Sequence, residues 1–327
     1  MNRLREKGMT VEGIARALGV SKTTVSRALS GKGRVSEETR LRVRGFVERG
    51  GGGPEQRSTG TLTVVIPPRF VETGLPFVYA CLHGIGYAAR LRNYDVLLCA
   101  ADERDHTQLE RQLERRKSDG VILFRTMNGE DPCLETVRRH HKPCVVLGRF
   151  EDDGILQVDS ANLEAAREMT GLLLRMGLRR IAYVYDDVNT TINLDRLQGF
   201  ARALKEAGIP VDQSMIYSDL MTEAQRLDAL ESIMRRRPDC ILCCDDRLAL
   251  YILELMRQQG IRCPDQIRLA SLYDSQFLQW ASVTAVQFDS EALGASACRA
   301  LLDSIAGKEV ALRQVQPYQI ILRESTK

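Results

Sequence analysis

Short apolar runs alternate with amphipathic segments from Leu62 to the end of the chain, and this alternation restricts the fold more than any other feature. Apolar runs separated by helical patterns are typical of βαβ units, in which crossover helices join parallel strands. The runs that we expect to be strands are 62–66, 96–99, 121–124, 144–147, 156–158, 181–185, 215–217, 240–244 and 269–273. The pattern restarts after residue 158, which predicts an α/β fold of two similar lobes, each a doubly wound parallel sheet, with a ligand cleft between them.

A polar, glycine-rich segment at 50–61 separates this alternation from the first 49 residues. Four consecutive glycines followed by proline are typical of a flexible linker. We therefore expect a head at 1–49, a linker, and a sensor domain at 62–327. Within the sensor we expect an N-terminal lobe (lobe N, about 62–158 and 287–312) and a C-terminal lobe (lobe C, about 159–286 and 313–327).

Three short helices fit the head, with Thr10, Ser21 and Ser36 in the positions of their N-caps. Gly19 permits a tight turn between the first two helices, and the small Ala15 lets them cross closely. This spacing predicts a three-helix domain that contains a helix-turn-helix motif. The backbone amides that begin such helices also suit phosphate groups, which makes all three cap residues candidate DNA contacts.

Packing of Val25 onto the first helix leaves four residues on the outer face of the second: Lys22, Thr23, Ser26 and Arg27. This face of a recognition helix enters the major groove, where Arg and Lys pair with guanine and Thr contacts thymine. The head holds twelve Lys and Arg against five Glu, a net +7, whereas the whole chain is only +3. A basic head on a mildly acidic body favours operator DNA as partner over the alternative, a helix bundle with a solvated basic face.

Composition excludes several other classes. No apolar window is long enough for a transmembrane helix, and the basic N-terminus lacks the apolar core of a secretory signal, so we expect a cytoplasmic protein without a membrane partner. The nine cysteines are odd in number and lie mostly in apolar runs, which favours free thiols over disulfides. Cys240 and Cys243 could suggest a metal pair, but a buried strand is the favoured interpretation. His140 and His141 are likewise assigned to a loop, so no metal and no cofactor is expected.

The head sequence resembles that of the lactose-repressor (LacI/GalR) family in the stretch Gly19-Val-Ser-Lys-Thr-Thr-Val-Ser-Arg-Ala-Leu-Ser-Gly31. Further matches follow in the family's order along nearly the whole chain, among them Asp119-Gly-Val-Ile-Leu123, Arg196-x-x-Gly-Phe200, Tyr273-Asp274 and Leu322-Arg-Glu-Ser325. The resemblance implies a transcriptional regulator, commonly a repressor, with a periplasmic-binding-protein-like sensor. It also implies a homodimer or tetramer and a sugar or nucleobase effector.

The linker departs from the family pattern. The family places a short hinge helix there, with a leucine that wedges into the minor groove, whereas residues 50–61 contain no leucine. Apolar wedging between base steps therefore has no obvious donor in this chain. The resemblance also assigns the dimer interface to lobe N, where a helix at 77–92 carries Val78, Cys81, Leu82 and Ile85 at helical spacing.

Candidate effector residues follow the ends of strands that should meet between the lobes. From this placement, or from the resemblance, the candidates are Arg69, Phe77, Arg149, Arg196, Asp245, Asp274 and Phe288. Arginine with carboxylates and aromatic faces suits a sugar or related polyol, through hydrogen bonds and ring stacking. For Arg196 and Asp245 the alternative is an ion pair that merely ties the lobes together. Asp159 is assigned a structural role at the lobe crossover.

Other function classes lack their motifs. The chain contains no GxGxxG, no phosphate-binding P-loop motif and no GxSxG, so we do not expect an enzyme. A secreted solute-binding protein would share the two lobes but not the basic head. A regulator that is controlled by a protein co-effector remains the alternative to one that is controlled by a small molecule. The clusters at 115–117 and 235–237 end helices, where cations favour the helix dipole, and are assigned to solvent rather than to a second DNA surface.

Overall fold

The computed structural model describes residues 10–31, 33, 35–48, 58–68, 70, 76–124, 129–151, 154–186, 190–220 and 222–327. The chain divides into two compact units, Met1–Ser58 and Thr59–Lys327, and each has a core of its own. Within these ranges no helix is long and apolar enough to cross a membrane. The division assigns residues 59–61 to the sensor domain, although the sequence pattern predicts that they belong to the linker.

The head is built from α2 (Val11–Leu18), α3 (Lys22–Ser30) and α4 (Glu37–Glu48). Among its described residues, five buried side chains from all three helices form the core: Ile14, Ala15, Val25, Ala28 and Val43. Gly19 ends α2 in the left-handed conformation, with φ of 64°, which a residue with a side chain adopts only with strain. The expected helix-turn-helix is therefore present, with its turn at the expected glycine.

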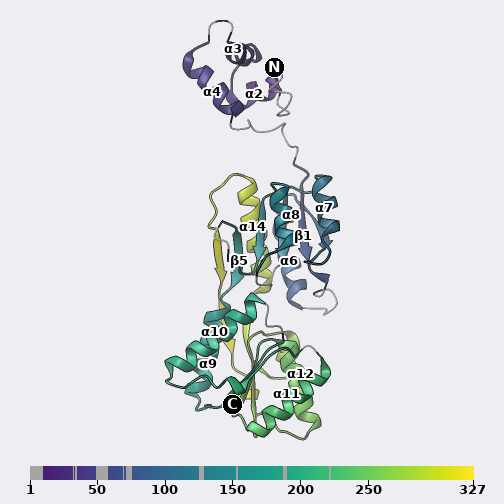
Figure 1. Cartoon of the computed structure of the whole chain (residues 1–327), viewed down its shortest axis with the longest axis vertical. Coiled ribbons are helices and arrows are strands. Elements are labelled where there is room, and N and C mark those ends of the chain that lie inside the picture. The colour runs from purple at the N-terminus through teal and green to yellow at the C-terminus, as the bar shows by residue number, and fades with distance from the viewer. Residues whose placement is uncertain are drawn as a thin grey trace. The chain divides into compact units, whose positions relative to one another are not determined.

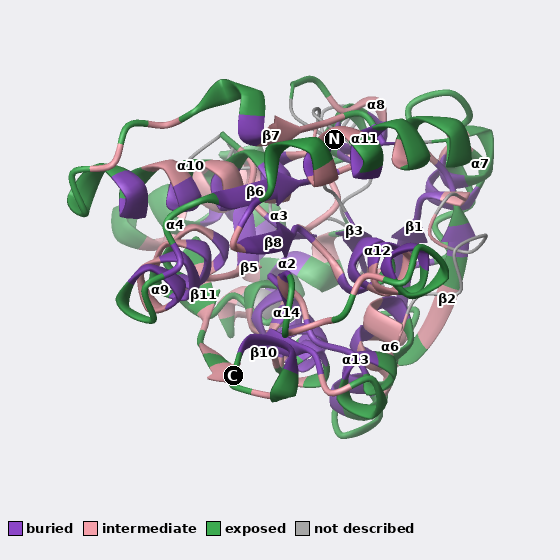
Figure 2. Ribbon diagram, turned by 90° about the horizontal axis from the view of Figure 1, so that it is seen from below, coloured by how far each residue is buried: buried purple, intermediate pink, exposed green. Residues whose placement is uncertain are grey.

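Lobe N contains a six-stranded sheet in the order β11-β5-β4-β3-β1-β2, and every pair is parallel. The strands are β1 (Thr61–Ile66), β2 (Asp95–Ala100), β3 (Gly120–Phe124), β4 (Cys144–Leu147), β5 (Leu156–Ser160) and β11 (Arg313–Gln316). One face packs against α6 (Pro76–Arg90) and α14 (Ser290–Ile305), and the other against α7 (Thr107–Glu114) and α8 (Pro132–Arg139). Figure 2 shows the buried residues concentrated on the strands and on the inward faces of the helices.

Lobe C contains a second six-stranded sheet, in the order β12-β10-β9-β8-β6-β7. Its strands are β6 (Ile181–Val184), β7 (Ile216–Tyr217), β8 (Cys240–Cys243), β9 (Arg268–Ser271), β10 (Thr284–Phe288) and β12 (Tyr318–Ile321). Among the strand pairs of this sheet that the structure describes, β10–β12 is antiparallel and the others are parallel. The helices are α9 (Asn162–Arg175), α10 (Thr191–Glu206), α11 (Glu223–Arg236), α12 (Asp246–Gln258) and α13 (Gln276–Trp280), as labelled in part in Figure 1. Cys240 and Cys243 are fully buried in β8, in agreement with the strand interpretation.

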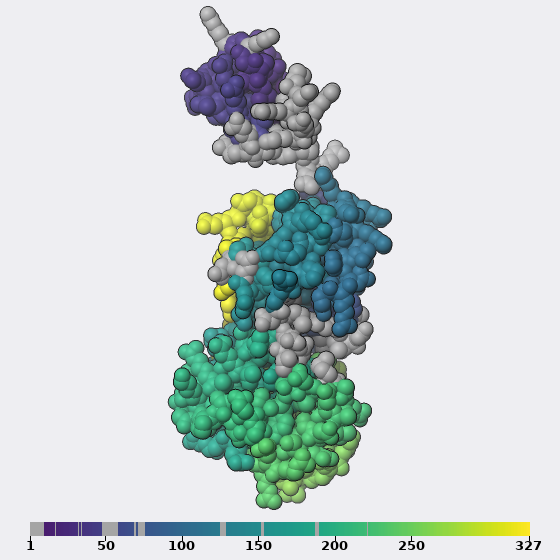
Figure 3. Space-filling view, in the orientation of Figure 1, coloured from purple at the N-terminus to yellow at the C-terminus, as the bar shows by residue number. Residues whose placement is uncertain are grey.

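The chain crosses between the lobes three times: from β5 to α9, from β10 to α14, and from β11 to β12. The expected lobe boundary at residue 312 is therefore too early, because β11 (313–316) pairs with β5 of lobe N. In Figure 3 the yellow C-terminal segment accordingly borders the teal part of lobe N. The sequence pattern also did not predict β10, β12 or α13.

Each lobe contains one pair of helices that cross at glycine. In lobe N a Cβ atom on Gly84 of α6 would lie 2.0 Å from the carbonyl oxygen of Glu291 on α14. In lobe C a Cβ atom on Gly199 of α10 would lie 2.2 Å from the carbonyl oxygen of Leu163 on α9. No side chain fits either place, so the two glycines set how closely these helices approach.

Candidate functional site

The four residues that were predicted to read bases are all exposed on α3: Lys22, Thr23, Ser26 and Arg27. The opposite face of the helix completely buries Val25 and Ala28 in the head core. Burial of these two side chains fixes the rotation of α3 about its axis, so the outward face is determined by packing and not by the polar residues themselves. This face offers one guanidinium, one ammonium and two hydroxyl groups, which can contact base edges and phosphates.

Lys22 already has an acidic neighbour in the head. Its Nζ lies 2.6 Å from Oε1 of Glu12 on α2, and both side chains are well exposed. The hydrogen bond with Lys22 holds the pKa of Glu12 below its usual value. A phosphate or a base would have to compete with Glu12 for this lysine, whereas no such pair is found for Arg27 among the described residues.

The three candidate phosphate contacts are N-cap residues. Thr10 Oγ1 accepts from Gly13 N at 3.1 Å, and Ser21 Oγ accepts from Thr24 N at 3.1 Å. Ser36 Oγ accepts from Thr39 N at 3.2 Å. Each hydroxyl thus satisfies one backbone amide, and the other amides of each first helical turn have no partner within the helix and remain suited to a phosphate.

In the sensor domain, Arg196 is the most firmly held of the candidate effector residues. It projects from α10 and is only 7% exposed. Its Nε donates to Asn162 Oδ1 at 3.1 Å, and its Nη1 donates to the carbonyl oxygen of Cys244 at 2.6 Å. Its guanidinium also lies 5.8 Å from the ring centroid of Phe288. The arginine is therefore preorganised at the ends of β8 and β10 of lobe C, beside the crossovers from β5 to α9 and from β10 to α14.

Asp245 follows β8 and begins α12, where its Oδ1 accepts from Leu248 N at 2.8 Å. Burial, together with the nearby carboxylate of Asp186, raises the pKa of Asp245. Ligand atoms of Asp186, Cys244 and Asp245 lie within 4.8 Å of one another, a spacing that could hold a metal ion. However, Nη2 of Arg247 lies 3.2 Å from Asp186 and 3.6 Å from Asp245. The arginine therefore already supplies the positive charge that this cluster requires.

One ion pair connects the lobes at this place. Arg149 follows β4 in lobe N, and its Nε lies 3.0 Å from Oδ2 of Asp195 on α10 in lobe C. The pair is shielded, since the side chain of Asp195 is only 12% exposed. Asp159 lies at the nearby crossover, where burial raises its pKa to about 6. Arg149 and Arg196 both act against this rise, and Asp195 adds to it, so the four charges form one network.

Aromatic rings form a second connection between the lobes. Phe77 of α6 meets Phe124 of β3 with ring centroids 6.2 Å apart, and it meets Tyr273 of lobe C at 6.1 Å. Tyr273 in turn lies nearly parallel to Phe288, with 6.3 Å between centroids. Phe77, Arg149, Asp195, Arg196, Tyr273 and Phe288 are called the interlobe cluster below. It combines ring faces with hydrogen-bonding charges, the chemistry that suits a polyol.

Asp274 does not join this cluster, so the geometry gives no support to its predicted contact with the effector. Both of its carboxylate oxygens accept hydrogen bonds from Arg323, at 2.9 and 2.6 Å, and its side chain is only 1% exposed. The bidentate pair instead ties the end of β9 to the C-terminal segment. Arg69 lies outside the described residues.

The sequence did not predict three residues that contribute to the site: Asn162, Asp195 and Tyr273. Asn162 orients Arg196, and Asp195 precedes it on the same helix. Tyr273 is held by a 3.0 Å contact between its hydroxyl and that of Ser290, and burial raises its pKa. An aromatic residue after a strand and an acid beside a candidate arginine were visible signals, but only the fold shows that they meet.

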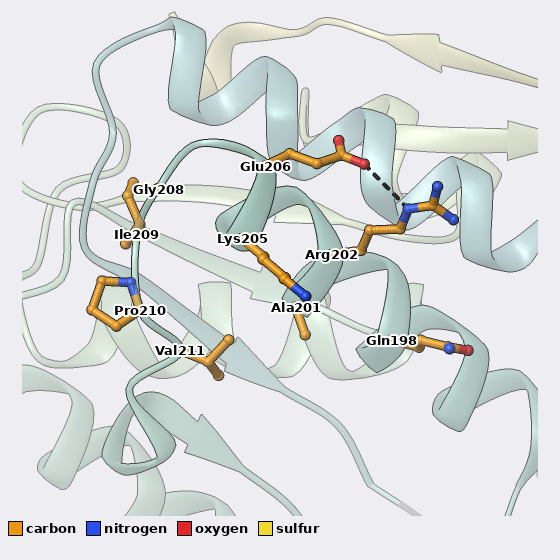
Figure 4. Close-up of a pocket in the computed structure, with 9 residues that line it drawn as sticks. All are labelled: Gln198, Ala201, Arg202, Lys205, Glu206, Gly208, Ile209, Pro210 and Val211. Carbon is orange, nitrogen blue, oxygen red and sulfur yellow. Dashed lines mark hydrogen bonds and ion pairs between the residues drawn. The ribbon is translucent and has the colours of Figure 1, made fainter.

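A shallow pocket of about 990 Å³ lies elsewhere on lobe C (Figure 4). It is formed by the exposed face of α10, including Arg202 and Lys205, and by the segment 208–211. Arg202 is paired with Glu206 at 3.2 Å, and none of the lining residues belongs to the interlobe cluster. The pocket is therefore a surface feature that is separate from the candidate effector site.

Comparison with known proteins agrees with this arrangement. The family profile described as "Bacterial regulatory proteins, lacI family" matches residues 10–50, and that described as "Periplasmic binding protein-like domain" matches 170–326. The chain is 27% identical to the HTH-type transcriptional regulator CelR of Thermobifida fusca, over 98% of this chain and 99% of that protein. It is 28% identical to the regulator DegA of Bacillus subtilis, over 97% and 98%.

A solved structure titled "transcriptional regulator CelR-cellobiose complex" is similar over 97% of this chain and 99% of that chain, with 27% identity and a TM-score of 0.73. A solved structure titled as a "probable maltose operon transcriptional repressor" from Staphylococcus is similar over 83% of this chain and 99% of that chain. Its TM-score is 0.75 at 19% identity, which bears on the fold alone. A basic helix-turn-helix head, two doubly wound lobes and the matches to both families agree with one another. The chain therefore combines a LacI-family head with a periplasmic-binding-protein-like domain, and its relatives over nearly the whole length are transcriptional regulators, not enzymes.

Proposed function

We propose that this protein is a repressor that binds two-fold-symmetric operator DNA through α3 and is controlled by a sugar or related polyol at the interlobe cluster. The observation that carries the DNA proposal is the outward face of α3. Its four polar residues are exposed because Val25 and Ala28 are buried beneath them. Arg27 is the residue for base readout, because its guanidinium is exposed and has no described acidic partner.

The effector proposal rests on the preorganisation of Arg196. A buried guanidinium that is already oriented by Asn162 and the Cys244 carbonyl can offer its remaining N–H groups to hydroxyls at little entropic cost. The rings of Phe77 and Phe288 lie beside it and would stack on the apolar face of a sugar. The cellobiose complex of a relative supports the same class of effector.

The proposal includes a homodimer, formed through an apolar stripe on lobe N. Three members of the expected stripe, Val78, Cys81 and Ile85, are buried in the lobe's own core and cannot form an interface. The fourth, Leu82, is half-buried against the same core. The exposed apolar residues of this region are different ones: Tyr79, Tyr87, Leu91 and Leu98, which are 75%, 51%, 60% and 52% exposed. Tyr79, Tyr87 and Leu91 repeat at intervals of four or eight residues along α6 and just beyond it, and Leu98 lies on the neighbouring edge strand β2.

The test of DNA reading begins with selection of a binding site from random duplexes, followed by affinity measurements with Arg27→Ala. Loss of a bidentate contact to guanine should weaken the selected site by about 1–3 kcal/mol and leave random DNA nearly unaffected. Ser36→Ala is the control, which should weaken both kinds of DNA alike. Equal losses for both DNAs with Arg27→Ala would show that the arginine contacts only phosphate.

The test of the effector is a thermal-shift screen of sugars and nucleosides, because a ligand that binds only the folded state raises the melting temperature. A hit should then change the operator affinity of the full chain. A hit that leaves operator affinity unchanged would separate binding from regulation and contradict the proposed control.

A further inference from the structure

The first residues of the sensor domain are held by one carboxylate. Thr59 donates to Asp119 Oδ1 through both its backbone N, at 2.9 Å, and its Oγ1, at 3.1 Å. Gly60 N donates to Asp119 Oδ2 at 3.1 Å. Asp119 is itself fixed, because it immediately precedes β3 and its N donates to the carbonyl oxygen of Thr61 at 2.8 Å. Three donors therefore converge on one half-buried side chain at the point where the chain enters β1.

Lobe C contains the same arrangement. Asp239 immediately precedes β8, and its Oδ2 accepts from Arg179 N at 2.7 Å and from Arg180 N at 2.8 Å. Its own N donates to the carbonyl oxygen of Arg180 at 2.8 Å. In each sheet, then, the carboxylate of an aspartate directly before the third strand accepts backbone hydrogen bonds from the residues that lead into the first strand. We call this arrangement a clamp.

The consequences of the two clamps differ. The residues that Asp239 holds join α9 to β6, and both of these elements are already packed in the lobe C core. The residues that Asp119 holds follow the glycine-rich segment 50–53 and Pro54, so no preceding element of the sensor holds them. The boundary between the two compact units falls at Ser58 and Thr59, directly before the clamped residues.

We propose that Asp119 is a positioning residue that fixes the point at which the linker leaves the sensor domain, and so sets the length of chain between the head and the lobes. The span open to a DNA-binding head grows with the number of residues between the head and the first residue that the sensor holds. Without the clamp, Thr59 and Gly60 add to that number. The link to regulation rests on the proposed operator binding, but the clamp itself does not.

The first experiment uses trypsin on the full chain without DNA or effector. Arg57 lies two residues before Thr59, so cleavage after it requires residues 58–60 to enter the protease. Arg49 lies eight residues before Arg57 and serves as an internal reference. Asp119→Ala should increase the ratio of cleavage after Arg57 to cleavage after Arg49 by about tenfold or more, since local opening limits such cleavage. Asp239→Ala removes the equivalent bonds in lobe C and should leave this ratio unchanged.

Two milder variants keep the test decisive where Asp119→Ala fails to fold. Thr59→Val removes one of the three bonds, and Asp119→Asn replaces one acceptor oxygen by a donor, so both should raise the ratio by smaller factors. A wild-type ratio in all three variants, or an equal rise with Asp239→Ala, would overturn the proposal.

The second experiment measures affinity for selected operators in which the half-sites are moved apart by one base pair. A fixed exit point makes the affinity depend on this spacing. The spacing preference is the affinity for the selected operator divided by that for the widened one, and Asp119→Ala should reduce it by about threefold. Asp239→Ala should leave it unchanged. A changed trypsin ratio with an unchanged spacing preference would overturn the positioning role while leaving the clamp. Absence of operator binding by the wild type would instead contradict the proposed function.

Discussion

Lobes N and C are built on the same plan but present different chemistry. In both, five parallel strands follow the same order, β2-β1-β3-β4-β5 in one and β7-β6-β8-β9-β10 in the other. In both, one helix pair crosses at a glycine, and an aspartate clamps the entry to the first strand. Lobe C, however, supplies Asp195, Arg196, Tyr273 and Phe288 to the interlobe cluster, whereas lobe N supplies Phe77 and Arg149 and an exposed apolar stripe.

This difference separates residues that serve the scaffold from residues that serve function. Features that recur in both lobes, such as Gly84 and Gly199, answer a requirement of the doubly wound fold. Features that occur in one lobe only, such as Arg196 or Tyr87, have no counterpart that the fold demands. Variants in the first group should therefore behave alike in the two lobes, and variants in the second group should not.

The largest effect is expected at the crossing glycines. Gly84→Ala and Gly199→Ala each introduce a Cβ atom about 2 Å from a backbone carbonyl oxygen, so the helices must separate. Each should lower the free energy of unfolding by about 3 kcal/mol or more, measured by urea denaturation. The controls are Gly86→Ala and Gly171→Ala on the same or partner helices, where a Cβ meets nothing within 4 Å or only the flexible end of Arg175. If only one of the two variants lowered the free energy of unfolding, the two helix crossings would not be equivalent.

The second effect concerns the stripe that only lobe N presents. Tyr87→Asp introduces a charge into the proposed dimer interface and should raise the dimer dissociation constant by about 100-fold, because an unpaired charge is costly to bury. Sedimentation at micromolar concentration measures this change. Leu227→Asp, at a half-exposed apolar position of α11 in lobe C, should leave the dimer intact. A stable dimer of the Tyr87→Asp variant would show that the dimer interface does not lie on α6.

The two lobes also differ in how well the sequence predicted them. Most central strands were visible as apolar runs because they are buried on both faces. Strand β10 was missed although it is central, because Thr284 and Gln287 interrupt its apolar residues. Strands β11 and β12 were missed because they are short edge strands, with exposed and half-buried residues in alternation and no continuous apolar run. The two-lobed plan and the helix-turn-helix could therefore be predicted, but the last boundary between the lobes could not.

The partners of some site residues could not be predicted for a related reason. Arg196 and Phe288 lie together as expected, since both follow from the family pattern or from strand ends. Asp274 looked equally suitable, but its partner Arg323 lies 49 residues later in the chain. The outward stripe of α6 was misassigned because α14, which covers Val78 and Cys81, is more than 200 residues away in sequence. A single sequence carries no signal for such contacts.

The third prediction tests the chemistry that only lobe C contributes. Arg196→Ala should weaken effector binding by about 100-fold, since a buried guanidinium contributes about 1.5–3 kcal/mol through each charged hydrogen bond. DNA affinity without effector should be retained, because the head is a separate unit. Titration calorimetry with a ligand from the screen measures the loss. Arg202→Ala, on the exposed face of the same helix, is the control and should bind the effector normally.

The smallest effect is expected at Asp159, where the two lobes meet. Burial raises its pKa to about 6, so the folded state favours the protonated carboxyl. The stability that this proton contributes is fully present below the unfolded pKa, near 4, and is lost as the pH rises through about 6. Asp159→Asn mimics the protonated group and keeps an oxygen that can accept from Ser160 N and Asn162 Nδ2.

The variant should therefore match the wild type near pH 4 and exceed its free energy of unfolding by about 1–2 kcal/mol at pH 7.5, measured by urea denaturation at both pH values. Asp105→Asn is a control of opposite sign, because hydrogen bonds from Thr107 lower the pKa of Asp105 and its carboxylate stabilises the fold at higher pH. Parallel pH dependence of Asp159→Asn and the wild type would mean that Arg149 and Arg196 fully compensate the buried charge. The interlobe charges would then make no net contribution to the free energy of unfolding. The lobes would be joined mainly by the contact between the rings of Phe77 and Tyr273.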